Sequence, residues 1–380
     1  MKNKDIKNHN YVLIMAGGIG TRLFPRSTEN LPKQFQKIVG NKTLIEQTYD
    51  RVRKIVKDDH IFISTHSSYL KLLKKMFPGI PGENYIIEPV RRNTGPAMAL
   101  ATAVIYDKDK DAIIITNASD HLVTKEDEYV SRILDGTHVI ENNDDFILCV
   151  GITPSSPHTG YGYIEKGKKF QGEKYHSIFR VKRFVEKPGT ELAKEYFVSG
   201  NFLWNAAYFI WQARHFLDEI KHEDPAMFAG INKIIQAKNS NAYERVLNEE
   251  FEKFQNIAVD YLVIEKTKNL LVLPADMGWS DVGNWDVVDA INSHLRDENG
   301  NYAEGGTVIN VNTRNTTVLS HGDKIIATVG MENIIIVTTE EAFVIIPKGR
   351  SEDVKKIVEE LISKKSLIGK KLPGKARRKA

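Results

Sequence analysis

The sequence predicts an α/β protein with a mostly parallel, doubly wound sheet, followed by a small β unit and a closing helix. Short apolar runs alternate with helical stretches through the first half of the chain, which is the pattern of a parallel sheet with helices on both faces. After residue 305, short β runs follow one another without helices between them. The length of 380 residues exceeds what one core ordinarily holds, so a large domain and a smaller unit are expected.

The first predicted strand covers residues 11–16, because this continuous apolar run is typical of a parallel strand buried on both faces. An amphipathic helix is predicted over residues 43–56. The runs that follow predict strands at 60–64, 85–87, 112–116 and 146–152, and helices at 67–76, 95–106 and 125–141. Ligands bind beyond the carboxyl ends of the strands in such sheets, so the loops there are expected to carry the function.

The second half of the chain is expected to complete the sheet and then to change character. Residues 159–294 mix strands with helices, are rich in aromatic residues and are interpreted as an extension of the same sheet. Closely spaced β runs from 305 to 347 predict a separate β unit, for which a short β-helix is one candidate. Residues 351–362 predict the closing helix, with Ser351 as its N-cap. The expected domains are residues 1–300 and 301–365, followed by a basic tail at 366–380.

Composition excludes several classes of protein. With 41% hydrophobic and 27% charged residues the chain is too apolar for disorder. Its longest apolar stretch, residues 95–106, is shorter than the ~20 residues of a membrane span, and the run at 11–16 is too short for a signal peptide. The single cysteine, Cys149, excludes an internal disulfide. A soluble, cytoplasmic protein without a membrane partner is therefore expected.

The net charge of +4 comes from the C-terminal residues. Residues 363–380 carry eight basic residues and no acid, which leaves 45 basic against 49 acidic residues in the rest of the chain. Nucleic-acid-binding faces interleave basic and aromatic side chains, and this tail contains no aromatic residue. Nucleic acid is not expected as a partner, and a homodimer stays open beside a monomer.

A glycine-rich segment directly after the first predicted strand is the strongest candidate for a phosphate site. Glycines let backbone N–H groups approach an anion closely, Arg22 offers a bidentate fork, and Lys33 adds a point charge. The segment lacks the Gly-Lys-Ser/Thr ending of a Walker loop, and Leu23 stands where a dinucleotide fingerprint needs Gly or Ala. A plain tight turn is the alternative. The backbone candidates are Ala16, Gly17, Gly18, Gly20 and Thr21.

Residues 17–35 resemble the signature of the sugar-nucleotide pyrophosphorylases, GGxGTRLxPxS followed by PKQF, most closely that of the members that make GDP-mannose. The resemblance continues in the same order over residues 11–362. Its later segments are Glu88-Pro89, residues 93–97, Asp120-His121, residues 159–164, residues 184–188, Trp204-Asn205, Asp260-Tyr261, Glu265-Lys266 and residues 278–283. The resemblance implies a Rossmann-like nucleotidyltransferase domain whose substrates are GTP and mannose 1-phosphate.

The implied reaction is attack of a sugar 1-phosphate oxygen on the α-phosphorus of GTP, with release of pyrophosphate. No covalent enzyme intermediate is implied, so catalysis depends on positioning and charge neutralisation. The resemblance makes Arg22 and Lys33 the candidate catalytic residues, and Asp120 and Asp281 the ligands of Mg²⁺, which takes one or two protein carboxylates beside phosphates and water. By its own context Asp120 is ambiguous, because a lone loop aspartate is most often a turn former.

Glu88 is the candidate for recognition of the base. A carboxylate accepts two hydrogen bonds from the adjacent N1–H and N2 amino donors of guanine, whereas uracil and thymine offer one donor between two carbonyl oxygens. An exposed strand-end glutamate is the alternative. By resemblance, Asn93, Thr94 and Gly95 complete the nucleotide site.

The resemblance assigns the sugar phosphate to Gly160, Glu186, Lys187 and Asn205. Glutamate and asparagine side chains bond sugar hydroxyls, a glycine lets the backbone reach a hydroxyl, and the lysine pairs with the phosphate. A hairpin turn and an exposed charge pair are the alternatives. Where the family has Trp-Asn-Ser-Gly, this chain has alanine at 206 and 207, so a hydroxyl and a glycine backbone are lost there.

Two alternative functions are kept beside GDP-mannose synthesis. The same chemistry on another sugar phosphate or nucleotide, such as a heptose or glucose, is the first. The second is a regulatory subunit that only binds sugar nucleotide, which the retention of Arg22, Lys33, Asp120 and Asp281 opposes. A nicotinamide dehydrogenase is disfavoured by Leu23.

Overall fold

The computed structural model describes residues 9–18, 20–171 and 177–367, and the chain forms two compact units. The first unit joins the chain up to Gly17 to Ile45–Asp281, and the second joins Gly18–Leu44 to the chain from Val282 onward. The sequence predicted a first domain that ends at residue 300 and includes residues 18–44, whereas these residues pack with the C-terminal part of the chain. The predicted domain limits of 1–300 and 301–365 remain a proposal.

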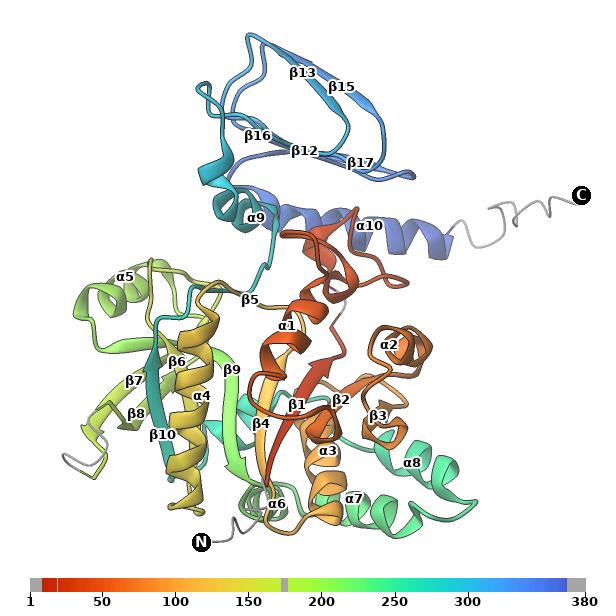
Figure 1. The fold of residues 1–380 in the computed structure, drawn as a ribbon, viewed down its shortest axis with the longest axis vertical. Coiled ribbons are helices and arrows are strands. Elements are labelled where there is room, and N and C mark those ends of the chain that lie inside the picture. The colour runs from red at the N-terminus through yellow and green to blue at the C-terminus, as the bar shows by residue number, and fades with distance from the viewer. Residues whose placement is uncertain (1–8, 19, 172–176, 368–380) are drawn as a thin grey trace, which may run out of the picture. The chain divides into compact units, whose positions relative to one another are not determined.

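The first unit is built on a nine-stranded mixed sheet (Figure 1). In sheet order its strands are β3 (Tyr85–Glu88), β2 (Ile61–His66), β1 (Asn10–Ala16), β4 (Ile113–Ala118), β9 (Phe202–Gln212), β6 (Ile147–Ile152), β10 (Leu270–Ala275), β8 (Phe179–Val185) and β7 (Gly162–Lys169). The first four are parallel, as their apolar runs predicted. Strand β9 then runs antiparallel to both β4 and β6, which the sequence did not predict.

Helices cover both faces of this sheet. Gly136 of α4 (Glu126–Glu141) lies so close to Ile210 and Leu148 that an added Cβ would meet their side chains. The neighbouring residues along the strands point to the other face, where they share a core with α3 (Thr94–Lys108) and α6 (Ala213–Glu223). The other helices before residue 282 are α1 (Leu44–Val52), α2 (Leu70–Met76), α5 (Thr190–Ser199), α7 (Pro225–Ala237) and α8 (Tyr243–Phe251). The predicted layered α/β architecture is confirmed.

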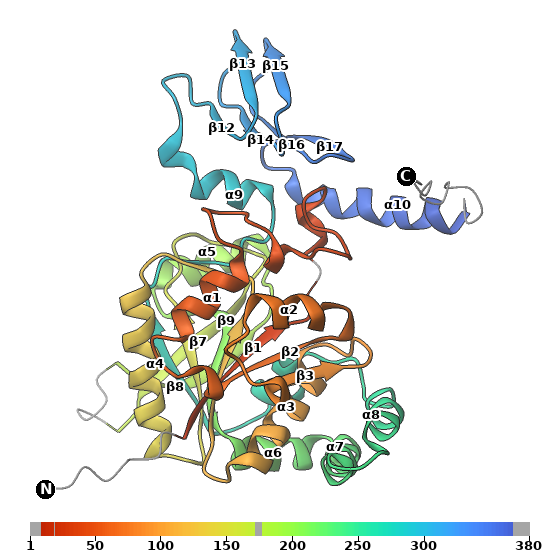
Figure 2. The same ribbon diagram turned by 45° about the vertical axis from the view of Figure 1, so that its right-hand side comes forward.

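The second unit contains two stacks of short strands (Figure 2). One sheet has the order β12 (Tyr302–Glu304), β14 (Thr317–Leu319), β16 (Ile334–Thr338) and β17 (Phe343–Pro347), and the other pairs β13 (Thr307–Val311) with β15 (Ile325–Val329). The chain passes between the sheets in parallel turns of 15 or 18 residues, since Tyr302 pairs with Thr317 and Thr317 with Ile335. The expected β-helix is confirmed, and the unequal turns explain why no strict period is visible in the sequence.

Helices α9 (Trp285–Ile291) and α10 (Val354–Leu367) belong to the same unit. The prediction that Ser351 caps the closing helix is wrong. Ser351 is buried inside the 3₁₀ turn Ser351–Asp353 that precedes α10, and its N–H donates to Asp286 Oδ2 at 3.0 Å. None of the described helices combines the length and apolar character that crossing a bilayer requires.

Candidate active site

Glu88 ends β3 and is buried, with 5% of its surface exposed. Its Oε1 accepts a hydrogen bond from Ser64 Oγ at 2.8 Å, and a Cβ added at Gly17 would lie 3.6 Å from the same oxygen. Burial raises the pKa of this carboxyl, against the opposing effects of the Ser64 hydrogen bond and of Arg91. The alternative of an exposed strand-end glutamate is therefore wrong, and the predicted base reader lies beside the first glycine after β1.

Asn93, Thr94 and Gly95 lie where α3 begins, and each of them already has a hydrogen bond within the protein. Thr94 Oγ1 accepts a hydrogen bond from the Val259 N–H at 2.9 Å, and the Gly95 N–H donates to the Ile257 carbonyl at 3.0 Å. A Cβ added at Gly95 would stand 2.7 Å from that carbonyl oxygen, so a larger residue would displace this segment. Asn93 has a φ of 67°, and its side chain accepts the Thr94 N–H at 2.8 Å.

Asp120 and Asp281 stand next to a short antiparallel pair of strands, β5 (Leu122–Val123) and β11 (Trp279–Ser280). The first residue of β5 pairs with the last residue of β11. Asp120 lies two residues before β5 and Asp281 directly follows β11, so the two predicted metal ligands, far apart in the sequence, flank one pair of strands.

Two aromatic side chains form hydrogen bonds beside Asp120 and Asp281. The Tyr161 hydroxyl donates to Asp281 Oδ1 at 2.8 Å. The Trp279 indole N–H, which can only donate, lies 3.1 Å from His121 Nδ1, so this histidine is held as a structural acceptor. Carboxylate oxygens from two loops are the ligands that a hard divalent cation prefers, so Asp120 and Asp281 fit the predicted Mg²⁺.

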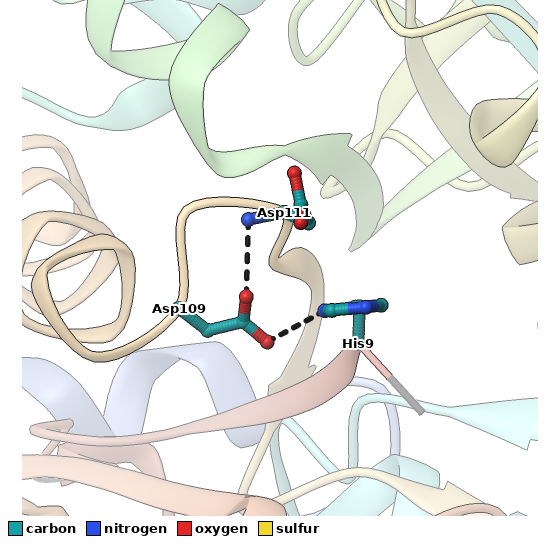
Figure 3. A group of neighbouring side chains, drawn as sticks. All are labelled: His9, Asp109 and Asp111. Carbon is teal, nitrogen blue, oxygen red and sulfur yellow. Dashed lines mark hydrogen bonds and ion pairs between the residues drawn. The ribbon is translucent and has the colours of Figure 1, made fainter. Parts of the chain in front are cut away.

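A second group of carboxylate and imidazole side chains lies before β1 and after α3 (Figure 3). Asp109 accepts hydrogen bonds from His9 Nδ1 at 2.8 Å, the Tyr11 hydroxyl at 3.1 Å and the Asp111 N–H at 3.0 Å. Burial raises the pKa of Asp109, but these bonds outweigh it and hold the pKa below its usual value. The group ties the amino end of β1 to the loop before β4, away from the carboxyl ends where ligands bind, and is not assigned to the site.

Three of the four predicted sugar-phosphate residues, Glu186, Lys187 and Asn205, lie close together around β7, β8 and β9. Lys187 Nζ lies 2.9 Å from Glu186 Oε1. A Cβ added at Gly162 would stand 2.5 Å from Glu186 Oε2, and Gly162 pairs with Asn205 across β7 and β9. Gly162, which the sequence analysis did not single out, is therefore the glycine that lets the glutamate and the asparagine approach each other. Gly160 lies outside this contact, in the exposed loop before β7.

Ala207 has a left-handed backbone, with a φ of 55°. Its N–H donates to Asn205 Oδ1 at 3.0 Å. The expected loss of the glycine backbone is therefore wrong, because the alanine takes the conformation that glycine adopts without strain. Asn93, Lys187 and Val282 also have positive φ values and lie at or beside predicted site residues. Such strain tends to collect at binding sites.

We expect Ala207→Gly to raise the free energy of unfolding by about 0.5–1 kcal/mol, because left-handed strain exceeds the entropic cost of glycine. Thermal unfolding followed by circular dichroism measures the change. Ala206→Gly is the matched control: its position is buried and has no positive φ, so the same substitution should lower Tm. A Tm of the Ala207 variant at or below that of the wild type would contradict the strain.

In the second unit the glycine-rich segment is folded against the residues that follow it. Lys33 is buried, with 7% of its surface exposed. A Cβ added at Gly20, whose φ is 71°, would stand 2.9 Å from three side-chain carbons of Lys33. Gln34 Nε2 donates to the Gly18 carbonyl at 3.0 Å. The two halves of the predicted phosphate loop therefore form one structure, and Gly20 is required by the approach of the lysine stem.

Arg22 lies in the 3₁₀ turn Thr21–Leu23 and forms an ion pair, with its Nε 2.8 Å from Glu352 Oε2. Glu352 Oε1 accepts a hydrogen bond from Asn284 Nδ2 at 2.8 Å, and Asn284 caps α9. The guanidinium of Arg22, which is predicted to bind phosphate, is therefore held through its Nε by residues from the C-terminal part of the chain. No local signal in the sequence points to Glu352.

Comparison with known proteins identifies the family of this chain. Residues 11–298 match the nucleotidyl transferase family, and residues 306–361 match the MannoseP isomerase/GMP-like beta-helix domain. A mannose-1-phosphate guanylyltransferase of Escherichia coli K12 is 34% identical over 362 residues, which cover 92% of this chain and 73% of the relative. The mannose-1-phosphate guanylyltransferase ManC of Salmonella typhimurium is 33% identical, with the same coverage.

A solved structure shows the same fold over nearly the whole chain. The crystal structure described as a mannose-1-phosphate geranyltransferase from Thermus thermophilus has a TM-score of 0.83 and 25% sequence identity. It covers 93% of this chain and 100% of that chain. With both domains matched in order, the chain belongs to the nucleotidyl transferase family and, within it, to the mannose-1-phosphate guanylyltransferases.

Proposed function

We propose that this protein transfers GMP from GTP to α-D-mannose 1-phosphate, giving GDP-mannose and pyrophosphate. The observation that supports the proposal is the pairing of β5 with β11, because Asp120 and Asp281 flank these two strands in a chain of this family. A binding protein has no need of two loop carboxylates held together in this way. GTP is a cytoplasmic metabolite, which supports the expected cytoplasmic location.

In the proposed reaction a phosphate oxygen of the sugar attacks the α-phosphorus of GTP, and the bond from that phosphorus to pyrophosphate breaks. Mg²⁺, held by Asp120 and Asp281, would neutralise charge on the phosphates. Arg22 and Lys33 are proposed to bind phosphate oxygens of GTP, with Arg22 supplying a planar fork. Main-chain N–H groups at Gly17, Gly18, Gly20 and Thr21 would add donors.

The sugar is proposed to lie against Glu186 and Asn205, whose approach Gly162 permits. Glu186 offers acceptors and Asn205 a donor to hexose hydroxyls. Lys187, 2.9 Å from Glu186, is proposed to pair with the sugar phosphate once the substrate competes for its ammonium.

A panel of nucleoside triphosphates against hexose and heptose 1-phosphates, scored by pyrophosphate release, tests the proposal. The expected result is the highest catalytic efficiency with GTP and mannose 1-phosphate. Preference for glucose or a heptose would reassign the sugar. Binding of GDP-mannose without pyrophosphate release from any pair would favour the regulatory subunit instead.

Glu88→Gln tests the reading of guanine. The substitution keeps the shape of the side chain but turns one acceptor into a donor that faces the donors of guanine. We expect a loss of about 2–4 kcal/mol in the catalytic efficiency with GTP, as for a mispaired hydrogen bond to a buried charge, while UTP gains relative to GTP. An unchanged ratio of the two efficiencies would show that the base is read elsewhere.

The pH dependence of GTP use provides a second measurement on Glu88. Its pKa is raised by burial, so the carboxylate that guanine needs is lost as the pH falls through this raised value, at a higher pH than for an ordinary glutamate. KM for GTP should therefore rise on acidification in the wild type and lose this dependence in Glu88→Gln. Glu83→Gln, at an exposed position five residues earlier, is the control and should behave as the wild type.

A further inference from the structure

The carboxamide of Asn205 is held at both ends. Its Nδ2 donates to Asp260 Oδ1 at 2.7 Å, and its Oδ1 accepts the Ala207 N–H at 3.0 Å. Because a backbone donor engages the oxygen, the amide has one orientation that satisfies both contacts. One N–H of the amide is then committed to Asp260, and the direction of the second is fixed with it.

Asp260 is itself placed by an unusual backbone. It begins the π-helical turn Asp260–Ile264, whose last three side chains are buried. Single π turns are rare and occur often at functional sites. The residues just before the turn bond to the start of α3, through the Ile257 carbonyl and the Val259 N–H. The carboxylate that holds Asn205 is therefore anchored to the segment proposed to contact the nucleotide.

The charges around Asp260 make a purely structural role costly. Burial raises the pKa of Asp260, and the charge of Glu186 raises it further, against the Asn205 hydrogen bond and Lys187. Burial also raises the pKa of Glu265, with Asp260 and Glu186 contributing. Glu186 and Glu265 therefore add repulsion around the carboxylate that holds Asn205. Carboxylates that repel one another and are kept together in a fold are typical of a binding site.

We propose that Asp260 is a positioning residue of the sugar subsite, which acts through Asn205. By accepting one N–H of the amide, Asp260 aims the other at a hydroxyl of the hexose 1-phosphate beside Glu186. This inference rests on the proposed function, because it takes the sugar phosphate as the ligand of Asn205. Asp260 contributes to affinity for the sugar and leaves GTP binding to other residues.

A double-mutant cycle of Asp260→Ala and Asn205→Ala tests the proposal, with KM for each substrate, kcat and Tm as readouts. Each single variant should raise KM for mannose 1-phosphate about tenfold, as for the loss of one buried hydrogen bond, with KM for GTP changed less than about twofold. The double variant should be no worse than Asn205→Ala, because Asp260 has no route to the sugar without that amide. Additive effects on KM would overturn the proposal.

Conservative variants separate positioning from stability. Asp260→Asn keeps an acceptor for Asn205, so KM for mannose 1-phosphate should stay within about threefold of the wild type. Asp260→Leu fills a similar volume without an acceptor and takes the place of the alanine variant if that variant does not fold. A kinetic loss that follows Tm across these variants, or that affects both substrates equally, would indicate a structural role and contradict the proposal.

The wild-type panel is measured before the cycle. If the wild type releases no pyrophosphate with mannose 1-phosphate, the proposed function fails, and the cycle is run on the sugar phosphate that the panel selects. If the wild type is active and the cycle is additive, only the role of Asp260 fails. The two failures are therefore distinguishable.

Discussion

Arg22→Lys is expected to lower kcat about a hundredfold or more and to raise KM for GTP much less, comparable to removing one preorganised donor. In-line attack spreads negative charge over the α-phosphate oxygens and the departing pyrophosphate, so a guanidinium fork gains most in the transition state. Lysine keeps the charge but loses the planar geometry. Lysine also lacks the Nε that lies 2.8 Å from Glu352 Oε2, so its ammonium group has neither the bidentate geometry nor this orienting contact. Steady-state kinetics that resolve kcat from KM measure the effect.

Arg26→Lys is the matched control within the same loop. Arg26 is largely buried, and its guanidinium lies 3.4 Å from both Glu304 Oε1 and the Ser320 carbonyl. These contacts belong to the second unit, so the control should lower Tm and leave kcat within about threefold of the wild type. If Arg22→Lys instead raised KM for GTP and preserved kcat, Arg22 would contribute to binding of the ground state. Stabilisation of the transition state would then be assigned to Lys33 and the metal.

Glu352→Gln asks whether the ion pair orients the arginine. The glutamine keeps an acceptor for Asn284 and loses the charge that faces Arg22 Nε. Both side chains of the pair are substantially exposed, so little change in stability is expected. A lowered kcat at unchanged Tm would show that the pair orients the guanidinium. A kcat equal to that of the wild type would limit Glu352 to a surface contact.

The sequence predicted those parts of the site that follow directly from a strand. The apolar run of β1 ends in glycines, and the run of β3 ends at Glu88, so both loops were placed at the carboxyl edge of a parallel sheet. The structure adds that Glu88 is buried beside Gly17. The amino-acid sequence alone does not indicate this burial. Strand ends were predictable because their hydrophobic pattern is local.

Residues that act through distant partners were not predictable. Asp260 meets Asn205 by means of a π-helical turn, and no sequence signal marks such a turn. Arg22 meets Glu352 because residues 18–44 fold with the C-terminal part, although they follow β1 in the chain. The antiparallel orientation of β9 between β4 and β6 was also not predicted, because an apolar run does not indicate the direction in which its strand runs in the sheet. The same strand also pairs with β7, which sets Asn205 opposite Gly162.

Asp281→Asn is expected to lower turnover about a hundredfold or more while leaving Tm unchanged, because it removes charge from the cation site without removing shape. The Tyr161 hydroxyl, which donates to Asp281 Oδ1 at 2.8 Å, finds an equivalent acceptor in asparagine. The pairing of β11 with β5 uses backbone groups, so the neighbourhood of Asp120 should persist. Titration of activity with Mg²⁺ should show a weaker apparent affinity for the metal in the variant.

Asp276→Asn is the control for this substitution, since Asp276 lies five residues earlier, is exposed and pairs with Lys125 Nζ at 2.6 Å. An exposed pair of this kind contributes little, so both turnover and the Mg²⁺ requirement should match the wild type. Excess chelator should abolish pyrophosphate release by the wild type, and added Mg²⁺ should restore it. Full activity of Asp281→Asn, or of the wild type in chelator, would remove the metal from Asp120 and Asp281. Charge neutralisation would then fall to Arg22 and Lys33 alone.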